Sequence, residues 1–286
     1  MLFNTIDFIF FLPVVVIIYY SLPQKGRWIL LLLASYFFYG SWNLNYLAFI
    51  VISTLIDYAC GLKMDKVDSK EKKRPFLILS LVSNLGLLFF FKYYNFFAYN
   101  LNSGISSNFP ILENVILPVG ISFYTFQTLS YSVDVYHGRQ KAESHLGYFA
   151  LYVSFFPQLV AGPIERATNL LPQFYKKRNF DYLNAVDGLK QILWGLFKKV
   201  VIADNCAIIV NDIFANYASY SGSTLIFGAI FFSFQIYGDF SGYSDIAIGT
   251  SRLFGFQLMQ NFAFPYFSRD IAEFWRRWHI SLSTWF

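Results

Sequence analysis

A short polar segment interrupts an apolar stretch of this sequence at residues 237–245. On a helix, Ser241 and Asp245 of this segment share a face, because they are four residues apart. Gly238 and Gly242 form a small-xxx-small pair that suits helix packing, but packing alone does not call for two acids. Charged residues at membrane depth are usually functional or paired, so we expect a polar site or a cavity wall here. The candidate site residues of the segment are Asp239, Ser241, Tyr243 and Asp245.

A second candidate is the run FWRRWHISLSTWF at 274–286. At 100° per residue, His279 falls at the centre of an apolar helical stripe, while Arg276 and Arg277 point elsewhere. An imidazole in an apolar pocket can stay neutral near pH 7 and act as a base or a hydrogen-bond donor. The alternative is a hydrogen-bonded core residue. The predicted stripe contains Trp275, Trp278, His279, Leu282 and Phe286.

Several common active-site patterns are absent from the sequence. It contains no Gly-rich phosphate loop, no GxSxG elbow and no His/Cys cluster with metal-ligand spacing, so no metal site is predicted. The net charge of +5 does not indicate a nucleic-acid partner. The basic residues form short clusters between apolar runs, and no separate basic face carries stacking aromatics.

The composition is that of a membrane protein. Hydrophobic residues make up 56% of the 286 positions, and charged residues only 14%. A soluble domain carries about 25% charged residues, which it needs to cover its surface. We therefore expect an all-α, polytopic bundle of transmembrane helices, and we treat residues 1–286 as a single domain because no repeat or linker divides them.

The apolar runs and the basic clusters together predict a topology. Because Lys25 and Arg27 follow the first run, the N-terminus is expected outside. The loop 41–45 has no Lys or Arg and is expected outside, whereas the basic cluster at 63–74 is expected in the cytoplasm. The candidate spans are about 6–22, 28–43, 46–62, 76–98, 115–134, 146–162, 186–210 and 224–258, the last long enough for two segments.

One apolar run does not fit a simple crossing. The run 146–162 has basic residues on both sides, and Pro157 and Gly162-Pro163 break it. Broken backbone at membrane depth is tolerated only where protein or a water-filled cavity covers it. We therefore predict that Phe155–Ile164 is re-entrant, the alternative being an interfacial helix pair. The mixed polar and apolar segment 181–200 is expected to lie in the interface as an amphipathic helix.

Several of these segments closely resemble the membrane-bound O-acyltransferase (MBOAT) family. They are LPVGISFYTFQTLSYSVDVY at 117–136, FFPQLVAGPI at 155–164, DFSGYSDIAIG at 239–249, NFAFPYF at 261–267 and FWRRWHISLSTW at 274–285. The likeness runs the full length of the chain and is strongest to the bacterial branch that includes alginate O-acetylases. Relatives of that branch include peptidoglycan O-acetylation proteins and the D-alanyl transfer protein of teichoic-acid modification.

The resemblance implies a bundle of helices around a central tunnel in the bacterial inner membrane. An acyltransferase of this kind moves an acyl group, in this branch acetyl, toward hydroxyls of an extracytoplasmic polysaccharide. It implies no bound cofactor, but an acyl thioester (acetyl-CoA or an acyl carrier) as co-substrate from the cytoplasmic side. It also implies an extracytoplasmic acetyltransferase or polysaccharide assembly proteins as partners.

The resemblance carries over roles to single residues. His279 matches the motif histidine of the family, and Asp239, Ser241, Tyr243 and Asp245 are expected to line the tunnel. Trp275 and Trp278 would shape it, and Arg276 would meet an anionic part of the donor or anchor the topology. The family's main catalytic histidine lies further along, and none follows His279 here. We therefore expect a chain truncated before its C-terminal portion and inactive alone.

Two other classes of function stay open at the level of the sequence. A transporter or flippase for a lipid-linked or acylated cell-envelope precursor would share the broken run and the intramembrane acids. It would move substrate without forming an ester. A structural scaffold for exopolysaccharide assembly would tolerate substitutions at Asp239 and His279.

Overall fold

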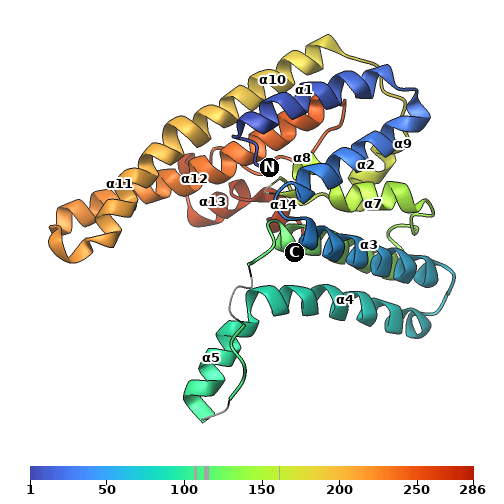
Figure 1. Cartoon of the computed structure of the whole chain (residues 1–286), viewed down its shortest axis with the longest axis horizontal. Helices are drawn as coiled ribbons and strands as arrows, with labels where there is room; N and C mark the ends of the chain where they lie inside the picture. The colour runs from blue at the N-terminus through green and yellow to red at the C-terminus, as the bar shows by residue number, and fades with distance from the viewer. Residues whose placement is uncertain (106–107, 113–115, 161) are drawn as a thin grey trace. The chain divides into compact units, whose positions relative to one another are not determined.

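The computed structural model of this chain consists of helices joined by loops, with no strand in the residues that it describes (Figure 1). Those residues are 1–105, 108–112, 116–160 and 162–286. Three helices are long and apolar enough to cross a membrane, namely Leu44–Asp65, Lys70–Lys92 and Gly222–Leu253. The expected all-α membrane fold is confirmed for this part of the chain.

The helices follow one another in the order drawn in Figure 1. They are α1 (Ile6–Ser21), α2 (Gln24–Gly40), α3 (Leu44–Asp65), α4 (Lys70–Lys92), α5 (Tyr94–Ile105), α6 (Ile121–Tyr136), α7 (Leu146–Ser154), α8 (Phe156–Leu159), α9 (Ala167–Tyr175), α10 (Tyr182–Leu196), a π-helix (Phe197–Ala203), α11 (Asp204–Ala215), a 3₁₀ turn (Tyr217–Ser219), α12 (Gly222–Leu253), a second 3₁₀ turn (Pro265–Phe267), α13 (Ile271–Arg277) and α14 (Ile280–Ser283).

Some boundaries differ from the expected spans. The run expected at 76–98 is divided between α4 and α5, which meet at Tyr93. The run expected at 115–134 begins as a helix only at Ile121, and residues 113–115 lie outside the described part of the chain. The run at 224–258 is one helix of 32 residues rather than two. At 1.5 Å per residue α12 is about 48 Å long, which exceeds the hydrocarbon thickness of about 30 Å.

Tertiary contacts group the chain into two compact units. We call residues 1–31, 162–165 and 175–286 the terminal unit, and residues 32–160 and 166–174 the middle unit. The single domain expected from the sequence stays a prediction.

The core of the middle unit contains a carboxylate. Asp57 on α3 is fully buried and accepts hydrogen bonds from Ser80 Oγ at 2.6 Å and from Asn84 Nδ2 at 2.9 Å, both on α4. From α6, Thr128 Oγ1 donates to Asn84 Oδ1 at 3.2 Å, and Ser132 Oγ lies 2.7 Å from Ser80 Oγ. One chain of polar contacts therefore connects three packed helices, as buried polar groups require.

The break predicted near Pro157 is present in the middle unit. Helix α7 ends at Ser154, and the Phe156 N–H donates to Ser35 Oγ at 3.1 Å instead of to Tyr152 O. The freed Tyr152 carbonyl accepts from Gln127 Nε2 at 2.6 Å and from Gln158 Nε2 at 3.0 Å. Side chains thus form the hydrogen bonds that the backbone groups lose at the break. A break at membrane depth is tolerated where the surrounding protein does this. That 155–164 is re-entrant stays a prediction, and its residue 161 lies outside the described part.

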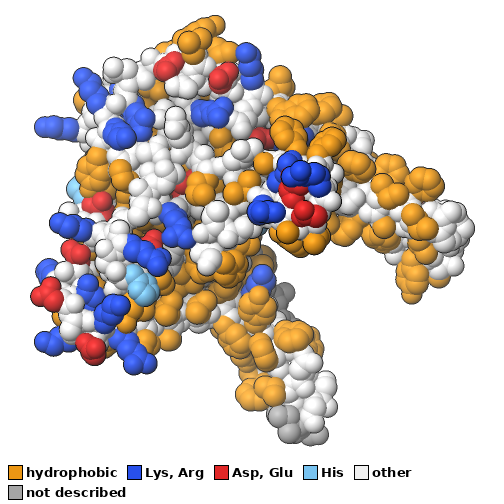
Figure 2. All heavy atoms as spheres, turned by 180° about the vertical axis from the view of Figure 1, so that it is seen from behind, with side chains coloured by type: hydrophobic (Ala, Val, Ile, Leu, Met, Phe, Trp, Pro, Cys, Tyr) orange, Lys and Arg blue, Asp and Glu red, His pale blue; other side chains and the backbone are white. Residues whose placement is uncertain are grey.

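Basic side chains gather at the loop between α3 and α4. In Figure 2, Lys and Arg side chains (blue) cover this end of the middle unit, whereas hydrophobic side chains (orange) cover α4 away from it. A charged end and an apolar shaft are typical of a helix pair that enters a membrane. The cluster consists of Lys63, Lys66, Lys70, Lys72, Lys73 and Arg74.

The terminal unit is built on the close antiparallel packing of α10 and its continuation against α12. A Cβ atom added to Gly195 would lie 2.6 Å from Gly242 O, and one added to Gly249 would lie 2.5 Å from Gly188 O. Only glycine allows two helix backbones to approach this closely. The prediction of a small-residue pair at Gly238 and Gly242 therefore captured part of a longer glycine contact.

Candidate functional site

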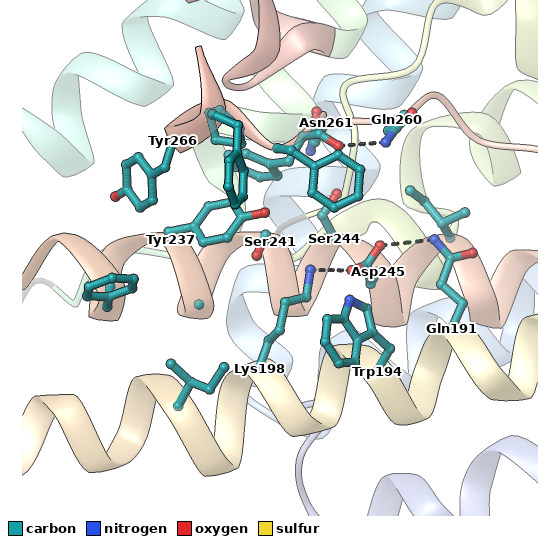
Figure 3. A pocket seen from close by; sticks show the side chains of 18 of the residues that line it. Gln191, Trp194, Lys198, Tyr237, Ser241, Ser244, Asp245, Gln260, Asn261 and Tyr266 are labelled. Atoms are coloured by element: carbon teal, nitrogen blue, oxygen red, sulfur yellow. Dashed lines mark hydrogen bonds and ion pairs between the residues drawn. The ribbon is translucent and has the colours of Figure 1, made fainter. Parts of the chain in front are cut away.

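The terminal unit contains a cavity of about 790 Å³ that is lined by α10, the π-helix, α12 and the loop 260–267 (Figure 3). Its walls are mostly apolar and include Trp194, Tyr237 and Phe262. A largely apolar cavity with a few placed polar groups is the usual form of a ligand site. The polar side chains in the wall are those of Gln191, Lys198, Ser233, Ser241, Ser244, Asp245, Gln260 and Asn261.

Asp245 lies at the centre of the polar wall. Its Oδ2 forms an ion pair with Lys198 Nζ, and its Oδ1 accepts from Gln191 Nε2 at 3.0 Å (Figure 3). Ser241, one turn earlier on α12, lines the same cavity, as the four-residue spacing predicted. The Lys198 side chain is 10% exposed. A buried charge is costly unless it is paired, so the acid and the base stabilise each other here.

The π-helix brings two successive lysines to α12. Lys199 Nζ lies 2.5 Å from Asp239 Oδ1 and 2.7 Å from Asp204 Oδ1, so it forms a second, separate ion-pair cluster. Tyr243 belongs to that cluster, because Lys199 Nζ lies 5.6 Å from its ring centroid. Asp239 and Tyr243 are therefore held on a different side of α12 from Asp245, and neither is among the residues that line the cavity. Insertions of π-helix within α-helices are frequent at functional sites.

Four buried side-chain atoms of cavity-wall residues have no hydrogen-bond partner among the described residues. They are Gln191 Oε1, Ser241 Oγ, Ser244 Oγ and Asn261 Nδ2, and the last two belong to residues that are 2% and 0% exposed. Buried polar groups are nearly always hydrogen-bonded to protein or to another molecule. Their position at this wall therefore indicates where a polar ligand atom would bind.

The C-terminal run is not the continuous helix that its periodicity predicted. Helix α13 ends at Arg277, His279 adopts a left-handed conformation (φ 45°, ψ 55°), and the short α14 begins at Ile280. The reason is a pairing with the cavity loop. The Ala263 N–H donates to Arg277 O at 3.0 Å, and the Ile280 N–H donates to Asn261 O at 2.9 Å. These tertiary hydrogen bonds replace the helical ones that would connect α13 to α14.

His279 lies behind the cavity wall. Its ring meets the Phe240 ring edge to face with centroids 4.7 Å apart, and Phe240 in turn lies 5.0 Å from Phe262, which lines the cavity. Burial lowers the pKa of His279 from its ordinary value of 6.5 to about 4, so the imidazole is neutral near pH 7. The left-handed backbone of a residue other than glycine costs about 1–3 kcal/mol, and such strain clusters at functional sites.

The other predicted residues of this run differ in their surroundings. Trp278 stacks on Phe274 and lies 6.1 Å, ring to ring, from Tyr237 of the cavity wall, so it supports the wall from behind. Trp275 is 57% exposed. Arg276 is also exposed, and its Nε donates to Ala272 O within α13 at 3.3 Å. Neither residue is among those that line the cavity.

The polar wall residues that the sequence did not mark as site candidates are Gln191, Lys198, Ser233, Ser244, Gln260 and Asn261. Lys198 belongs to the segment 181–200, which the sequence predicts to be an amphipathic helix in the interface, and its side chain points to α12. The sequence did contain a signal for Lys198. One apolar run contains Lys198 and Lys199, another contains Asp239 and Asp245, and charged residues within a membrane are usually paired. Asn261 carried no such signal before its neighbours in space were known.

The family model of the MBOAT, membrane-bound O-acyltransferase family, matches residues 31–286. The probable alginate O-acetylase of Pseudomonas syringae pv. tomato is 42% identical over 290 residues, which cover 100% of this chain and 56% of that protein. The peptidoglycan O-acetyltransferase of Helicobacter pylori is 41% identical over 317 residues, which cover 99% of this chain and 60% of that protein. The teichoic acid D-alanyltransferase of Bacillus subtilis is 31% identical over 181 residues, which cover 61% of this chain and 45% of that protein. The chain thus spans about three fifths or less of the length of these curated relatives.

Proposed function

Because the chain belongs to the membrane-bound O-acyltransferase family, we propose that it forms the membrane-embedded acyl-transferring part of an enzyme. The enzyme moves an acyl group, in this branch acetyl, from an activated donor on the cytoplasmic side toward hydroxyls of an extracytoplasmic polysaccharide. The names of the alginate and peptidoglycan relatives support acetyl as the group and a cell-envelope polymer as the acceptor.

The donor in this proposal is an acyl thioester, either acetyl-CoA or an acyl carrier. During transfer the bond between the acyl carbon and sulfur breaks, and a bond between that carbon and the acceptor oxygen forms. The hydroxyl proton leaves the acceptor and ends on the released thiol. An alcohol is a poor nucleophile until its proton is taken, so the reaction needs a base and a group that stabilises the developing oxyanion.

The observation that carries the proposal is the cavity with a buried ion pair in its wall and the His279 segment hydrogen-bonded to its loop. Its apolar side chains would exclude water, which would otherwise hydrolyse the acyl group. A neutral His279 behind Phe240 would help to position the reacting groups. Asp239 and Tyr243 would hold the neighbouring part of α12, Trp275 would border the tunnel, and exposed Arg276 would meet an anionic part of the donor.

The cellular setting follows from the same premise. We place the protein in the bacterial inner membrane with several crossings, where a cytoplasmic donor and an extracytoplasmic polymer can both be reached. An extracytoplasmic acetyltransferase or polysaccharide assembly proteins would receive the acyl group or deliver the acceptor. The relatives that act on peptidoglycan and teichoic acid support a cell-envelope setting of this kind.

The proposal is tested in a strain that lacks the gene, complemented with the protein as the cell makes it. We expect mass spectrometry of the cell-envelope polysaccharides to show acyl esters with the wild-type gene. Substitution His279→Ala should reduce them by about tenfold or more, because loss of the imidazole behind Phe240 would misplace the reacting groups. His137→Ala is the matched control, because His137 lies in an exposed loop, and it should leave the esters unchanged.

Three outcomes would count against the proposal. Movement of a precursor across the membrane without any new ester would identify a transporter. Full modification in both His279→Ala and Asp239→Asn would identify a scaffold. No change in any polysaccharide ester on deletion would reject acyl transfer to the cell envelope.

A further inference from the structure

We propose that Lys198, Ser244 and Asn261 form a binding site for the carbonyl oxygen of an acyl group. The apolar wall beside them would hold the acyl chain. This inference rests on the proposed acyl transfer and names the place in the chain where the transferred group is held.

Lys198 supplies the charge of the site. An ammonium group has three N–H donors, and Asp245 is the partner that the described residues provide for one of them. The Tyr237 ring lies 5.8 Å from Nζ and contributes a cation–π contact without using a hydrogen-bond donor in the cavity wall. The Lys198 side chain is 10% exposed, so its remaining donors lie in a place from which bulk water is largely excluded.

Asn261 supplies a second donor, and its amide orientation follows from its neighbours. The Ile164 N–H donates to Ser281 Oγ at 3.0 Å, so the Ser281 hydroxyl is free to donate its own proton. That hydroxyl lies 2.5 Å from Asn261 Oδ1, which accepts the proton. The Asn261 Nδ2 donors therefore point away from Ser281, and they have no partner among the described residues.

Ser244 supplies a third donor, one residue before Asp245 on α12. Its hydroxyl is buried in the wall and has no partner in the described part of the chain. Figure 3 shows Ser244 and Asp245 next to each other on α12, opposite the Lys198 side chain. The Lys198 ammonium and the unpartnered donors of Ser244 and Asn261 thus line one cavity. The Ser241 hydroxyl is also unpartnered there, and Gln191 Oε1 adds an unpartnered acceptor at the Asp245 end.

The balance of charge selects a carbonyl over a carboxylate. A donor-lined wall binds an acceptor oxygen, but the charge of Lys198 is already offset by Asp245. A carboxylate ligand would bring a second negative charge close to Asp245, which is unfavourable in a dry cavity. A neutral thioester or ester carbonyl avoids that repulsion. Its oxygen becomes negative only during transfer, when preorganised donors stabilise it most.

The cavity also has the size for this role. Its volume of about 790 Å³ exceeds that of a short acyl group, so part of the donor or acceptor can enter with it. Trp194, Tyr237 and Phe262 provide apolar and aromatic surface beside the donors. An acyl group would therefore meet polar groups at its carbonyl and apolar groups along its chain.

The test measures binding without any need for catalysis. The protein, in lipid nanodiscs, is titrated with S-acetyl-N-acetylcysteamine, a small acyl thioester, and binding is followed by saturation-transfer difference NMR. Lys198→Met should weaken binding by about tenfold or more, the loss of one hydrogen bond to a charged donor. Ser244→Ala should weaken it by about threefold. Lys199→Met is the matched control and should stay within about twofold, because Lys199 pairs with Asp239 and Asp204 instead.

A double variant distinguishes loss of the binding site from misfolding of the protein. Lys198→Met alone leaves Asp245 without its cation, whereas Lys198→Met with Asp245→Asn removes both charges of the pair. The double variant should retain the wild-type thermal midpoint to within a few degrees and still lose binding. Wild-type affinity in the double variant, or equal losses in the Lys198 and Lys199 variants, would overturn the proposal.

Titration with sodium acetate distinguishes the two oxygen ligands. Lys198-dependent binding of acetate in the absence of thioester binding would identify a carboxylate site and overturn the proposal. The outcome is separable from that for the overall function. If wild-type cells contain the esters but Lys198→Met leaves thioester binding unchanged, the carbonyl site is rejected and the proposal of acyl transfer is retained. If thioester binding depends on Lys198 but cells contain no esters, the carbonyl site is retained and acyl transfer to the cell envelope is rejected.

Discussion

At the scale of single residues, the separation of the two acids on α12 is decided by helix geometry. Asp239 and Asp245 lie six residues apart, so they point in different directions from one helix. Each has its own lysine, and the two lysines are adjacent in the π-helix. Only the Lys198 pair lies at the cavity, which makes the neighbouring Lys199 pair an internal control for the role of charge.

Asp57 in the middle unit is also a buried acid whose carboxylate is held by polar partners. Its two carboxylate oxygens accept from Ser80 and Asn84, and further hydroxyls on α6 continue the network. Ser80 and Asn84 both donate to Asp57, so loss of the carboxylate would leave these buried donors without their acceptor.

We predict that Asp57→Ala destabilises the protein by about 2 kcal/mol, from unsatisfied buried donors in Ser80 and Asn84. The measurement is the thermal midpoint of the purified protein in detergent, followed by the fluorescence of a thiol-independent dye. Asp65→Ala is the control, since Asp65 lies exposed on the same helix. A midpoint for Asp57→Ala equal to that of the control would show that the network contributes no stability.

At the scale of elements, the terminal unit depends on glycine contacts between α10 and α12. They place the helix backbones close enough for Lys198 and Gln191 to reach Asp245. The contact pairs residues far apart in sequence in an antiparallel register, Gly188 with Gly249 and Gly195 with Gly242. Any side chain there must push the two helices apart.

We expect Gly249→Val to destabilise the protein by about 1–3 kcal/mol, the usual cost of overpacking. A Cβ atom at this position would lie 2.5 Å from Gly188 O. Gly86→Ala on α4 is the control, because no atom lies within 4 Å of a Cβ added there, and alanine favours helix. The two are compared by thermal unfolding in the same detergent. Equal midpoints would mean that the backbones do not need this close approach.

The C-terminal run shows an element whose local pattern and tertiary role disagree. Periodicity predicted one helix with His279 on its apolar face. The backbone instead leaves the helix at Trp278 and His279 to bond with residues 261–263. His279 is half-buried, with its ring against that of Phe240. Periodicity could not predict the interruption, because the hydrogen-bond partners of the interrupted backbone lie on another segment.

At the scale of the whole molecule, the sequence predicts an orientation that charge placement alone supports. The exposed basic cluster between α3 and α4 should face the cytoplasm, and the loop before α3 should face outside. The three helices that are long enough to cross include both α3 and α4.

Cysteine labelling tests that orientation. With Cys60 and Cys206 replaced by Ser, a single cysteine is introduced as Asn45→Cys or as Lys72→Cys. A membrane-impermeant maleimide should label Asn45→Cys in intact cells and Lys72→Cys only after permeabilisation. The opposite pattern would invert the topology, and labelling of both in intact cells would mean that α3 does not cross.

The sequence by itself determined that the chain is a membrane protein and all-α, because these properties depend on its composition and periodicity. It also determined the helix break at Pro157, because proline lacks the N–H that a continuous helix needs. It also determined that Ser241 and Asp245 share a face. The tertiary structure alone decided that Lys198 pairs with Asp245, that Lys199 pairs with Asp239, and that the C-terminal run is interrupted between α13 and α14. Gln191 and Asp245 are 54 residues apart. Contacts at such separations depend on how closely helices pack, and local patterns carry no information about that distance.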